Sequence, residues 1–254
     1  MSQVNLAGKT ILITRPQFQA EIFASKLEQL DAKPIIKPSI LIKPALDQKP
    51  LQNSVQHLGQ YDGVIFSSLN GAKYFLDEVE VQRQKEVLQT RQLVAVGPVT
   101  EHYLNQREMD VDVVPELFLA QEMLSKLEVG KRYLMPQGNR TTQSSIEALG
   151  DVQIDRVLVY FNTFRDISDA EKKQIEQVHF DFITFTSASC ASGLLAWFAP
   201  SLLPDSLMNA FTICIGPSTA EAAQEAGFEN LLVAQEHTTE GMIDVMLERV
   251  NHEV

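Results

Sequence analysis

The sequence of 254 residues is poor in the residues that form disulfides or bind metal ions. It has two cysteines, Cys190 and Cys214, and neither lies in a CxxC pair or near a pair of histidines. This argues against a disulfide framework and against a structural zinc site. The five histidines are scattered without the spacing of metal ligands. We therefore expect no metal, and we expect both cysteines to be packing residues.

Long apolar runs and clusters of positive charge are also missing. The longest apolar stretches, such as 182–185 and 193–200, are far shorter than the roughly 20 residues that span a bilayer. The N-terminus lacks the basic and apolar regions of a signal peptide. The net charge is −12 without a block of Lys and Arg, which argues against nucleic acid or an anionic membrane as the main partner. We expect a cytoplasmic protein that binds neither nucleic acid nor membrane.

The sequence has no glycine-rich phosphate loop of the form GxGxxG or GxxxxGK(S/T). This weakens one class of function, a nucleoside or sugar-phosphate enzyme on a flavodoxin-like fold. What is present is an ordinary globular composition, with 44% apolar and 21% charged residues. The chain is long enough for two compact cores of about 100 to 130 residues each, so we expect two domains.

The chain repeats itself. Three stretches of the first half return in the second half: 8–16 (GKTILITRP) as 130–138 (GKRYLMPQG), 61–72 (YDGVIFSSLNGA) as 180–191 (FDFITFTSASCA), and 94–100 (VAVGPVT) as 213–219 (ICIGPST). If the first stretch is unit A and the other two form unit B, the order is A, B, A′, B′. A duplication this long exceeds a solenoid repeat and predicts two similar lobes, with a cleft between them that could hold a ligand.

Short, largely apolar runs, each followed by a helical pattern, indicate buried parallel strands with crossover helices. We predict such strands at 10–14, 63–67, 93–96, 111–114, 132–135, 182–186, 212–215 and 230–233. An amphipathic helix follows the first strand, from Pro16 to about Leu30. The predicted fold class is α/β, with two similar lobes built on parallel sheets. Sheets of this kind place their working loops at the carboxyl ends of the strands.

Two extended segments break this alternation. Residues 34–44 contain three prolines and cannot form a helix, and residues 152–162 alternate like a strand. Because they occupy equivalent positions in the two A units, they would suit a two-stranded connector between the lobes. A short connector predicts hinge motion. The residues alone leave open whether A packs with B or with B′.

The chemical signal lies in the turns that follow the strands. In each Gly-Pro stretch a glycine, Gly97 or Gly216, ends a strand, and a threonine, Thr100 or Thr219, lies in the first turn of the next helix. Free backbone N–H groups at such helix N-termini form an anion site made mainly of main chain. The turns after the other two strands add the hydroxyls of Ser67, Ser68 and Ser187. The alternative is plain helix capping, but its repetition in both lobes favours an anion site.

Taken in order, these motifs resemble uroporphyrinogen-III synthase. The matching stretches are 11–16 (ILITRP), 61–71 (YDGVIFSSLNG), 95–100 (AVGPVT), 113–116 (VVPE), 134–138 (LMPQG), 159–160 (VY), 215–219 (IGPST) and 238–241 (TTEG). None of them is specific alone, but the ordered set covers nearly the whole chain.

The resemblance implies a hydro-lyase of porphyrin and heme biosynthesis that closes linear hydroxymethylbilane into uroporphyrinogen III, with inversion of ring D and loss of water. It implies no cofactor and no metal. The partner would be a linear tetrapyrrole that binds between the lobes, and its eight carboxylates suit helix N-termini. We expect a monomer, because no apolar patch or heptad seam indicates a protein partner.

The resemblance also implies an architecture of two flavodoxin-like lobes joined by a two-stranded β connector, with A packed on B′. Lobe 1 would be discontinuous, formed by 1–36 and 164–254. Lobe 2 would be 44–152, and the connector would be 37–43 and 153–163.

One residue carries the expected chemistry. Tyr160 matches the tyrosine that the family has at its connector, so we expect it to donate a proton or hydrogen bond to the leaving hydroxyl. The alternative is an anchored, half-buried strand tyrosine. The predicted substrate-binding residues are Arg15, Ser67, Ser68, Asn70, Gly97, Thr100, Gln137, Gly138, Ser187, Gly216, Ser218 and Thr219.

The chain departs from the family pattern at two of these turns. Gln137 stands where the family often has arginine, although Arg140 is close, and Val99 stands where a small or hydroxyl residue is common. The alternative function is a non-catalytic, two-lobed module that binds a tetrapyrrole. Binding of a polycarboxylate without control of the isomer formed would favour that module.

Overall fold

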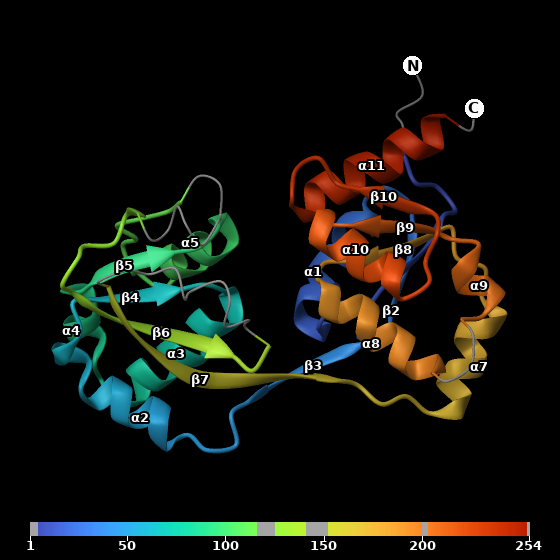
Figure 1. The fold of residues 1–254 in the computed structure, drawn as a ribbon. Coiled ribbons are helices and arrows are strands. Elements are labelled where there is room, and N and C mark those ends of the chain that lie inside the picture. Colours follow the sequence, from blue (N-terminus) through green and yellow to red (C-terminus); the bar gives the residue numbers. More distant parts are fainter. Residues whose placement is uncertain (1–4, 116–124, 141–151, 200–202, 253–254) are drawn as a thin grey trace. The chain divides into compact units, whose positions relative to one another are not determined.

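A computed structural model describes residues 5–115, 125–140, 152–199 and 203–252 of the chain. The chain divides into two compact units (Figure 1). Unit 1 consists of Met1–Leu41 and Thr163–Val254, and unit 2 of Ile42–Asn162. In the described part of the chain, every helix is too short or too polar to cross a membrane.

Unit 1 is built on a five-stranded sheet with the order β10-β9-β8-β1-β2. Its strands are β1 (Thr10–Ile13), β2 (Lys33–Ile36), β8 (Phe182–Phe185), β9 (Phe211–Cys214) and β10 (Leu231–Val233). All neighbouring strands pair in parallel, and Ile11 of β1 lies opposite Phe182 of β8. Strands from the N-terminal and C-terminal parts of the chain therefore form one sheet.

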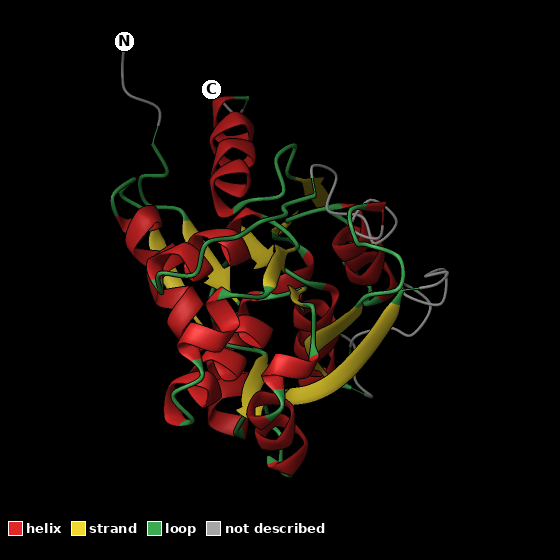
Figure 2. Ribbon diagram, turned by 90° about the vertical axis from the view of Figure 1, so that its left-hand side faces the viewer, coloured by secondary structure: helices red, strands yellow, loops and turns green. Residues whose placement is uncertain are grey.

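The helices of unit 1 bury the apolar side chains of this sheet. They are α1 (Gln17–Glu28), α7 (Asp169–Gln177), α8 (Ala188–Phe198), α9 (Asp205–Met208), α10 (Pro217–Glu225) and α11 (Thr239–Asn251). One core cluster joins Phe23 of α1 and Met242 of α11 to Ile13 of β1. Figure 2 shows the helices in red around the short strands in yellow.

Unit 2 has a sheet of its own, with the order β3-β7-β6-β4-β5. Its strands are β3 (Ile40–Pro44), β4 (Gly63–Phe66), β5 (Gln92–Ala95), β6 (Arg132–Gly138) and β7 (Gln153–Phe164). Its helices are α2 (Lys49–Gln56), a 3-10 turn (Leu58–Gln60), α3 (Leu69–Val81), α4 (Lys85–Gln89) and α5 (Pro98–Gln106). The β4, β5, β6 and β7 pairings are parallel.

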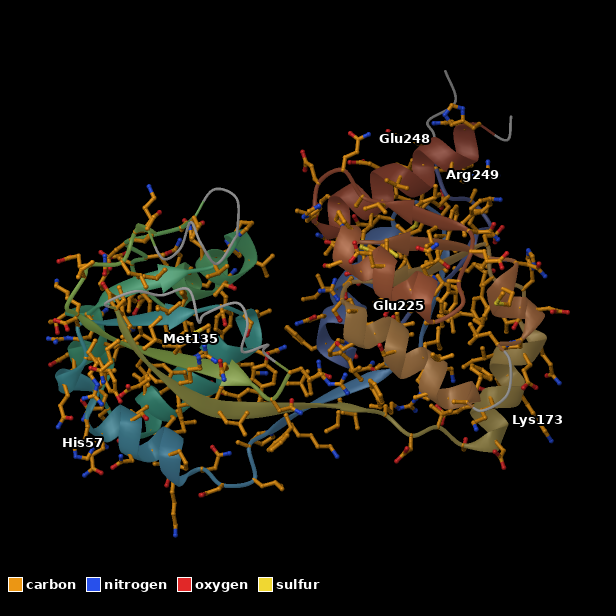
Figure 3. All side chains as sticks on the ribbon, in the orientation of Figure 1. His57, Met135, Lys173, Glu225, Glu248 and Arg249 are labelled. Atoms are coloured by element: carbon orange, nitrogen blue, oxygen red, sulfur yellow. The ribbon has the colours of Figure 1, made fainter. Side chains whose placement is uncertain are left out.

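Both faces of the unit 2 sheet are buried, because successive side chains of a strand point to opposite faces. Phe66 and Leu134 belong to one cluster, with Phe75 of α3. Ile65 and Met135 belong to a second cluster, and Met135 is labelled on β6 in Figure 3. This two-sided burial explains why the strands read as continuous apolar runs rather than alternating ones.

The structure confirms the predicted α/β class and the parallel sheets, and it has strands in seven of the eight predicted runs. The eighth prediction, 111–114, is wrong: Val113 forms only an isolated bridge with Val94. The predicted strand 132–135 continues to Gly138. The pairing question that the residues left open is answered by the register, since β1 pairs with β8 and β4 pairs with β6.

The extended segment 34–44 is not one strand. It divides into β2, in the sheet of unit 1, and β3, in the sheet of unit 2. Hydrogen bonds to unit 1 fix the residues between β2 and β3. The N–H of Lys37 donates to Ile13 O at 2.9 Å, and that of Ser39 donates to Thr14 O at 2.8 Å. The chain passes from unit 1 to unit 2 inside β3, between Leu41 and Ile42.

The return passage lies inside β7, between Asn162 and Thr163. Ala45 N–H donates to Val159 O, and Arg165 N–H to Ser39 O, so residue numbers rise on one strand as they fall on the other and β3 runs antiparallel to β7. From Gln153 to Tyr160, β7 also pairs with β6. Most of the segment 153–163 is thus a strand of the unit 2 sheet, and its assignment to a separate connector stays a prediction.

Candidate active site

The predicted site residues of unit 2 gather at the carboxyl ends of its parallel strands. Ser67 and Ser68 follow β4 directly, and Ser68 is the N-cap of α3. Its Oγ accepts a hydrogen bond from the N–H of Gly71 at 3.0 Å. Asn70 lies in the first turn of the same helix. This cap satisfies one of the N–H groups that the first turn of a helix leaves without an intrahelical partner.

The second turn of this edge follows β5. Gly97 precedes α5 with a φ of 100°, in the region that favours glycine because it has no Cβ. Pro98 opens the helix, Val99 is exposed, and Thr100 is buried in the first turn. Glu101 also lies in this turn, so the dipole end of α5 already has one carboxylate beside it.

Tyr160 lies on β7, and its hydroxyl is 3.4 Å from the Oγ of Ser68. Its ring faces the bare backbone of Gly138, its partner in the β6–β7 register. A Cβ at position 138 would lie 2.5 Å from Cε2 and Cζ of that ring. On α3, the ring of Tyr74 stacks with that of Tyr160 at 6.0 Å between centroids and 20° between planes. The phenol is therefore held by three neighbours.

Gln137 precedes Gly138 at a register shift between β6 and β7. Its Oε1 is buried, and among the described residues it has no hydrogen-bond donor. A buried acceptor without a partner costs free energy, about 1–3 kcal/mol, so it is a natural place for a ligand to donate a hydrogen bond. Arg140, expected close by, is exposed and donates through Nε to Asn162 O at 3.1 Å.

The predicted site residues of unit 1 gather at the equivalent edge of the other sheet. Arg15 follows β1 and donates from Nη2 to Oε1 of Gln19 at 3.0 Å. Its Nε is buried and has no acceptor among the described residues. Burial lowers the pKa of this guanidinium, while Cys190 and Glu240 act in the opposite direction. A half-buried cation with a spare donor suits a carboxylate ligand.

Two further turns complete the unit 1 edge. Ser187 precedes α8, but its Oγ contacts the Ser189 hydroxyl at 2.9 Å and the Cys190 Sγ at 3.2 Å instead of capping the helix. Gly216 precedes α10, in whose first turn Ser218 is exposed and Thr219 buried.

Gly216 differs from Gly97 in its backbone. Its φ of −170° is ordinary extended geometry. The ring of His237 lies next to this position, and a Cβ on Gly216 would be 3.4 Å from the His237 Nε2, an ordinary van der Waals distance. His237 follows β10 and was not predicted as a site residue.

Thr238 was also not among the predicted substrate-binding residues. It is the N-cap of α11 and its Oγ1 accepts from the N–H of Gly241 at 3.0 Å, as Ser68 accepts from Gly71. The shared pattern, a hydroxyl residue followed three positions later by glycine, is visible in 68–71 (SLNG) and 238–241 (TTEG) and could have identified Thr238. Tyr74 carried no such signal, because its role depends on how α3 packs on β7.

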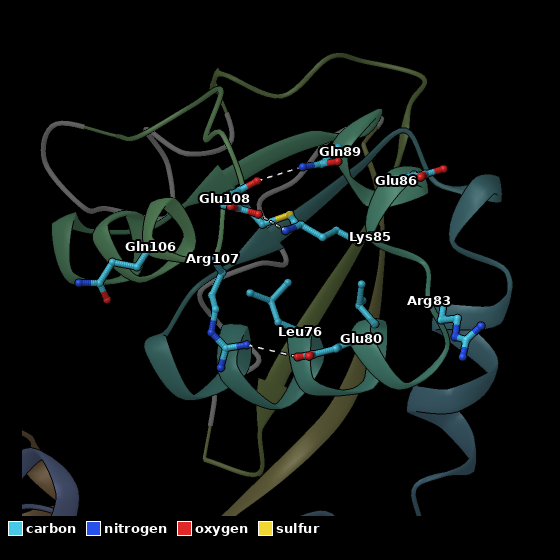
Figure 4. Close-up of a pocket in the computed structure, with 11 residues that line it drawn as sticks. Leu76, Glu80, Arg83, Lys85, Glu86, Gln89, Gln106, Arg107 and Glu108 are labelled. Carbon is cyan, nitrogen blue, oxygen red and sulfur yellow. Dashed lines mark hydrogen bonds and ion pairs between the residues drawn. The ribbon is translucent and has the colours of Figure 1, made fainter.

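A hollow in unit 2 lies elsewhere (Figure 4). It has a volume of about 800 Å³ and lies where α3 ends and α4 begins, at the amino-terminal edge of the strands. Lys85 pairs with Glu108 at 2.5 Å, and Arg107 with Glu80 at 3.6 Å, across this hollow. Its lining contains no predicted site residue. We place the candidate site at the carboxyl-terminal edge instead, because charged residues that line this hollow already pair with one another.

Residues 5–115, 125–140, 152–199 and 203–252 contain no group of three or more His, Cys, Asp or Glu side chains that could hold a metal ion.

A family model described as uroporphyrinogen-III synthase HemD matches residues 21–244. The porphyrin biosynthesis protein HemD of Ruminiclostridium josui is 29% identical over 96% of this chain, which spans about half (49%) of that protein. The uroporphyrinogen-III synthase of Synechococcus elongatus is 24% identical, with 96% of each chain covered.

Among solved structures, uroporphyrinogen-III synthetase from Helicobacter pylori aligns with 95% of this chain and 99% of its own. The TM-score is 0.66 and the sequence identity 17%. At that identity the likeness concerns the fold, and it agrees with the α/β architecture of parallel sheets described above.

Proposed function

The chain belongs to the uroporphyrinogen-III synthase family, and on this premise we propose that it closes linear hydroxymethylbilane into uroporphyrinogen III. The observation that carries the proposal is the family match over residues 21–244, which includes turns from both sheet edges. The reaction eliminates water and inverts ring D, so the proposed class is a cyclising hydro-lyase of porphyrin biosynthesis.

We propose that the substrate carboxylates bind mainly to main-chain N–H groups. The first turns of α3, α5, α8 and α10 supply these donors, with Ser67, Ser68, Asn70, Thr100, Ser187, Ser218 and Thr219 beside them. Such termini attract anions without a surplus of Lys and Arg, which reconciles a polycarboxylate substrate with a net charge of −12. Arg15 adds a cation whose Nε has no acceptor among the described residues, and Gln137 adds an Oε1 that has no donor among them.

The catalytic proposal concerns Tyr160. Its phenolic O–H donates to the hydroxyl of the terminal hydroxymethyl group, which departs with that proton as water and leaves an electrophilic azafulvenium cation beside the tyrosinate; the proton that ring D releases on final reclosure restores the phenol. The already substituted carbon of the terminal pyrrole then attacks to form a spiro intermediate, and fragmentation and reclosure leave ring D inverted. The spontaneous route attacks the free position and gives the type I isomer, so the main task is to impose geometry.

Two structural details belong to the same proposal. The two units correspond to flavodoxin-like lobes, and β3 with the end of β7 forms the two-stranded connector between them. The support is that both passages of the chain between units lie in this antiparallel pair. The monomeric state and the cytoplasmic location stay predictions.

The test is to supply freshly generated hydroxymethylbilane, oxidise the products and separate type I from type III porphyrin. We expect mainly type III from the wild type. Tyr160→Phe removes the donor and should lower kcat by about 100-fold or more. Tyr103→Phe is the matched control, because Tyr103 packs on the same core of unit 2 and its ring contacts the Arg107 guanidinium instead of Tyr160.

Two outcomes would contradict the proposal. Type I porphyrin alone, at the spontaneous rate, would contradict synthase activity and favour a module that only binds tetrapyrroles. Wild-type kcat in Tyr160→Phe would remove that tyrosine from the mechanism.

A further inference from the structure

Tyr160 is fixed from two sides by one helix. Ser68, at the N-cap of α3, lies 3.4 Å from the phenolic oxygen, and Tyr74, in the second turn of α3, stacks on the ring. The third side is the backbone of Gly138, which leaves no room for a Cβ. The hydroxyl and the ring plane of Tyr160 are therefore set by different neighbours.

Tyr74 is itself anchored. Its hydroxyl donates to the carbonyl of Ile42 at 3.5 Å, on the strand by which the chain enters unit 2. Burial, with a smaller contribution from Asp77, raises the pKa of this phenol, so it stays protonated and able to donate at neutral pH. Its ring packs against the main core of unit 2.

We propose that Tyr74 is a positioning residue for Tyr160. Its aromatic face holds the Tyr160 ring against Gly138 so that the phenolic O–H stays directed toward Ser68 and the leaving hydroxyl of the substrate. The inference rests on the function proposed above. Tyr74 acts through Tyr160 and needs no contact with the substrate.

Stacked aromatic pairs contribute about 0.5–1.5 kcal/mol beyond the area that they bury, and their planes constrain each other. A leucine at position 74 would fill much of the same apolar volume without a flat face. The Tyr160 ring would then be free to turn away from its productive orientation, and small misplacements of a reacting group lower rates strongly. Phenylalanine keeps the face and removes only the long hydrogen bond to Ile42.

Tyr103 provides the matched control. It lies on α5, packs on the same core as Tyr74, and has its pKa raised by burial in the same way. Its ring contacts the Arg107 guanidinium at 5.4 Å instead of Tyr160. Tyr103→Leu should therefore change the packing of unit 2 as much as Tyr74→Leu does, without loosening Tyr160.

The first experiment needs no turnover. All five tyrosines are replaced by 3-fluorotyrosine, and the ¹⁹F resonance of Tyr160 is assigned as the one missing in Tyr160→Phe. We expect Tyr74→Leu to shift and broaden this resonance, and Tyr103→Leu to leave it in place. An unchanged Tyr160 resonance in Tyr74→Leu would overturn the inference. Should that variant fail to fold by circular dichroism, Tyr74→Met replaces it.

The second experiment measures type III formation. We expect Tyr74→Leu to lower kcat by about 10-fold with KM within about twofold of wild type, because orientation changes while carboxylate binding does not. Tyr74→Phe should restore most of kcat, and Tyr103→Leu should retain it. Wild-type kcat in a folded Tyr74→Leu would overturn the inference. If the wild type itself forms no excess of type III, the proposed function fails, and the ¹⁹F result still decides whether Tyr74 orients Tyr160.

Discussion

The two sheet edges of this chain share the structure of their turns but differ in the side chains that surround them. In unit 1 and in unit 2, a Gly-Pro turn opens a helix whose first turn buries a threonine, Thr219 or Thr100. A hydroxyl cap paired with a glycine N–H also occurs in both, at Ser68 and at Thr238. The turns for which we propose main-chain anion binding thus occur in both units.

The side chains that surround these turns differ. Unit 2 supplies a phenol, Tyr160, held by Tyr74 and Gly138. Unit 1 supplies a half-buried cation, Arg15, with Cys190 and Glu240 as its electrostatic neighbours. Under the proposed function both edges would bind carboxylates, while Tyr160 of unit 2 would donate the proton and Arg15 of unit 1 would supply a partly buried cation. Four predictions test this division, from the largest expected effect to the smallest.

Gly138→Ala should lower kcat, because it changes the surroundings of Tyr160 in unit 2, and it should leave the structure of unit 1 unchanged. The added Cβ would lie 2.5 Å from the Tyr160 ring, which must move. We expect kcat to fall by about 100-fold. Gly59→Ala is the control, because a Cβ there meets no atom within 4 Å. Equal kcat values in the two variants, measured by porphyrin analysis, would mean that the position of the Tyr160 ring does not matter.

Arg15→Gln should weaken binding instead of chemistry. It removes the cation of the unit 1 edge, and a hydrogen bond to a charged group contributes about 1.5–3 kcal/mol. We expect KM to rise by about 10-fold or more, with kcat changed less. The exposed Arg83 serves as the control through Arg83→Gln, which should leave KM unaltered. A fall in kcat alone for Arg15→Gln would assign this arginine to the chemical step and contradict the division.

Thr100→Val and Thr219→Val compare the two edges at equivalent positions. Each change removes one hydroxyl from a first helical turn and keeps the shape of the side chain. We expect KM to rise about fivefold in each, from the loss of about 1 kcal/mol, and the effects to multiply in the double variant. Thr212→Val, within β9, is the control. An effect confined to one edge would show that the duplicated turns do not share the substrate.

Glu171→Gln should produce the smallest effect, a change of stability confined to unit 1. A hydrogen bond from Arg165 and the N–H of Ser168 lower the pKa of Glu171 to about 2. Because the pKa is lower in the folded state than its usual 4.5, the stabilisation is complete above that value and is lost as the pH falls toward 2.

We therefore expect Glu171→Gln to lower the melting temperature by about 2–4 °C at pH 7 and to leave it unchanged near pH 2. Trp197 is the single tryptophan of the chain and its Nε1 donates to Arg165 O at 2.6 Å, so its fluorescence reports on this part of unit 1. A difference that persists at pH 2 would contradict the assigned cause.

The sequence predicted the sheet strands well because the strands are buried on both faces. Runs such as 63–66 and 182–185 are short, apolar and fully buried, and that environment leaves little choice of residue. The prediction at 111–114 was wrong, although its apolar content was similar. There Val113 bridges to Val94 alone, and the Asp112 carboxylate accepts the Leu93 N–H, so a side chain replaces part of the ladder.

Long-range contacts were harder to predict. The break between β2 and β3 depends on Ser39, whose Oγ donates to Cys190 O at 2.8 Å, a residue far along the chain. The stacking of Tyr74 on Tyr160 joins a helix to a strand, and no sequence pattern predicts it. The turn motifs were predictable because capping is local, whereas the support of the candidate donor comes from tertiary packing.

The passage of the chain through β3 and β7 bears on how the protein is made. Unit 2 is one continuous segment, and its last strand, β7, is followed only by residues of unit 1. Every strand of the unit 2 sheet is therefore translated before β8, the strand that pairs with β1. During this interval the edge of β1 that pairs with β8 lacks its partner strand, and α11, which packs on the face of β1, has not been translated. Unit 2 can therefore fold before unit 1 is complete, so we expect unit 2 to be the first folded part of a newly made chain.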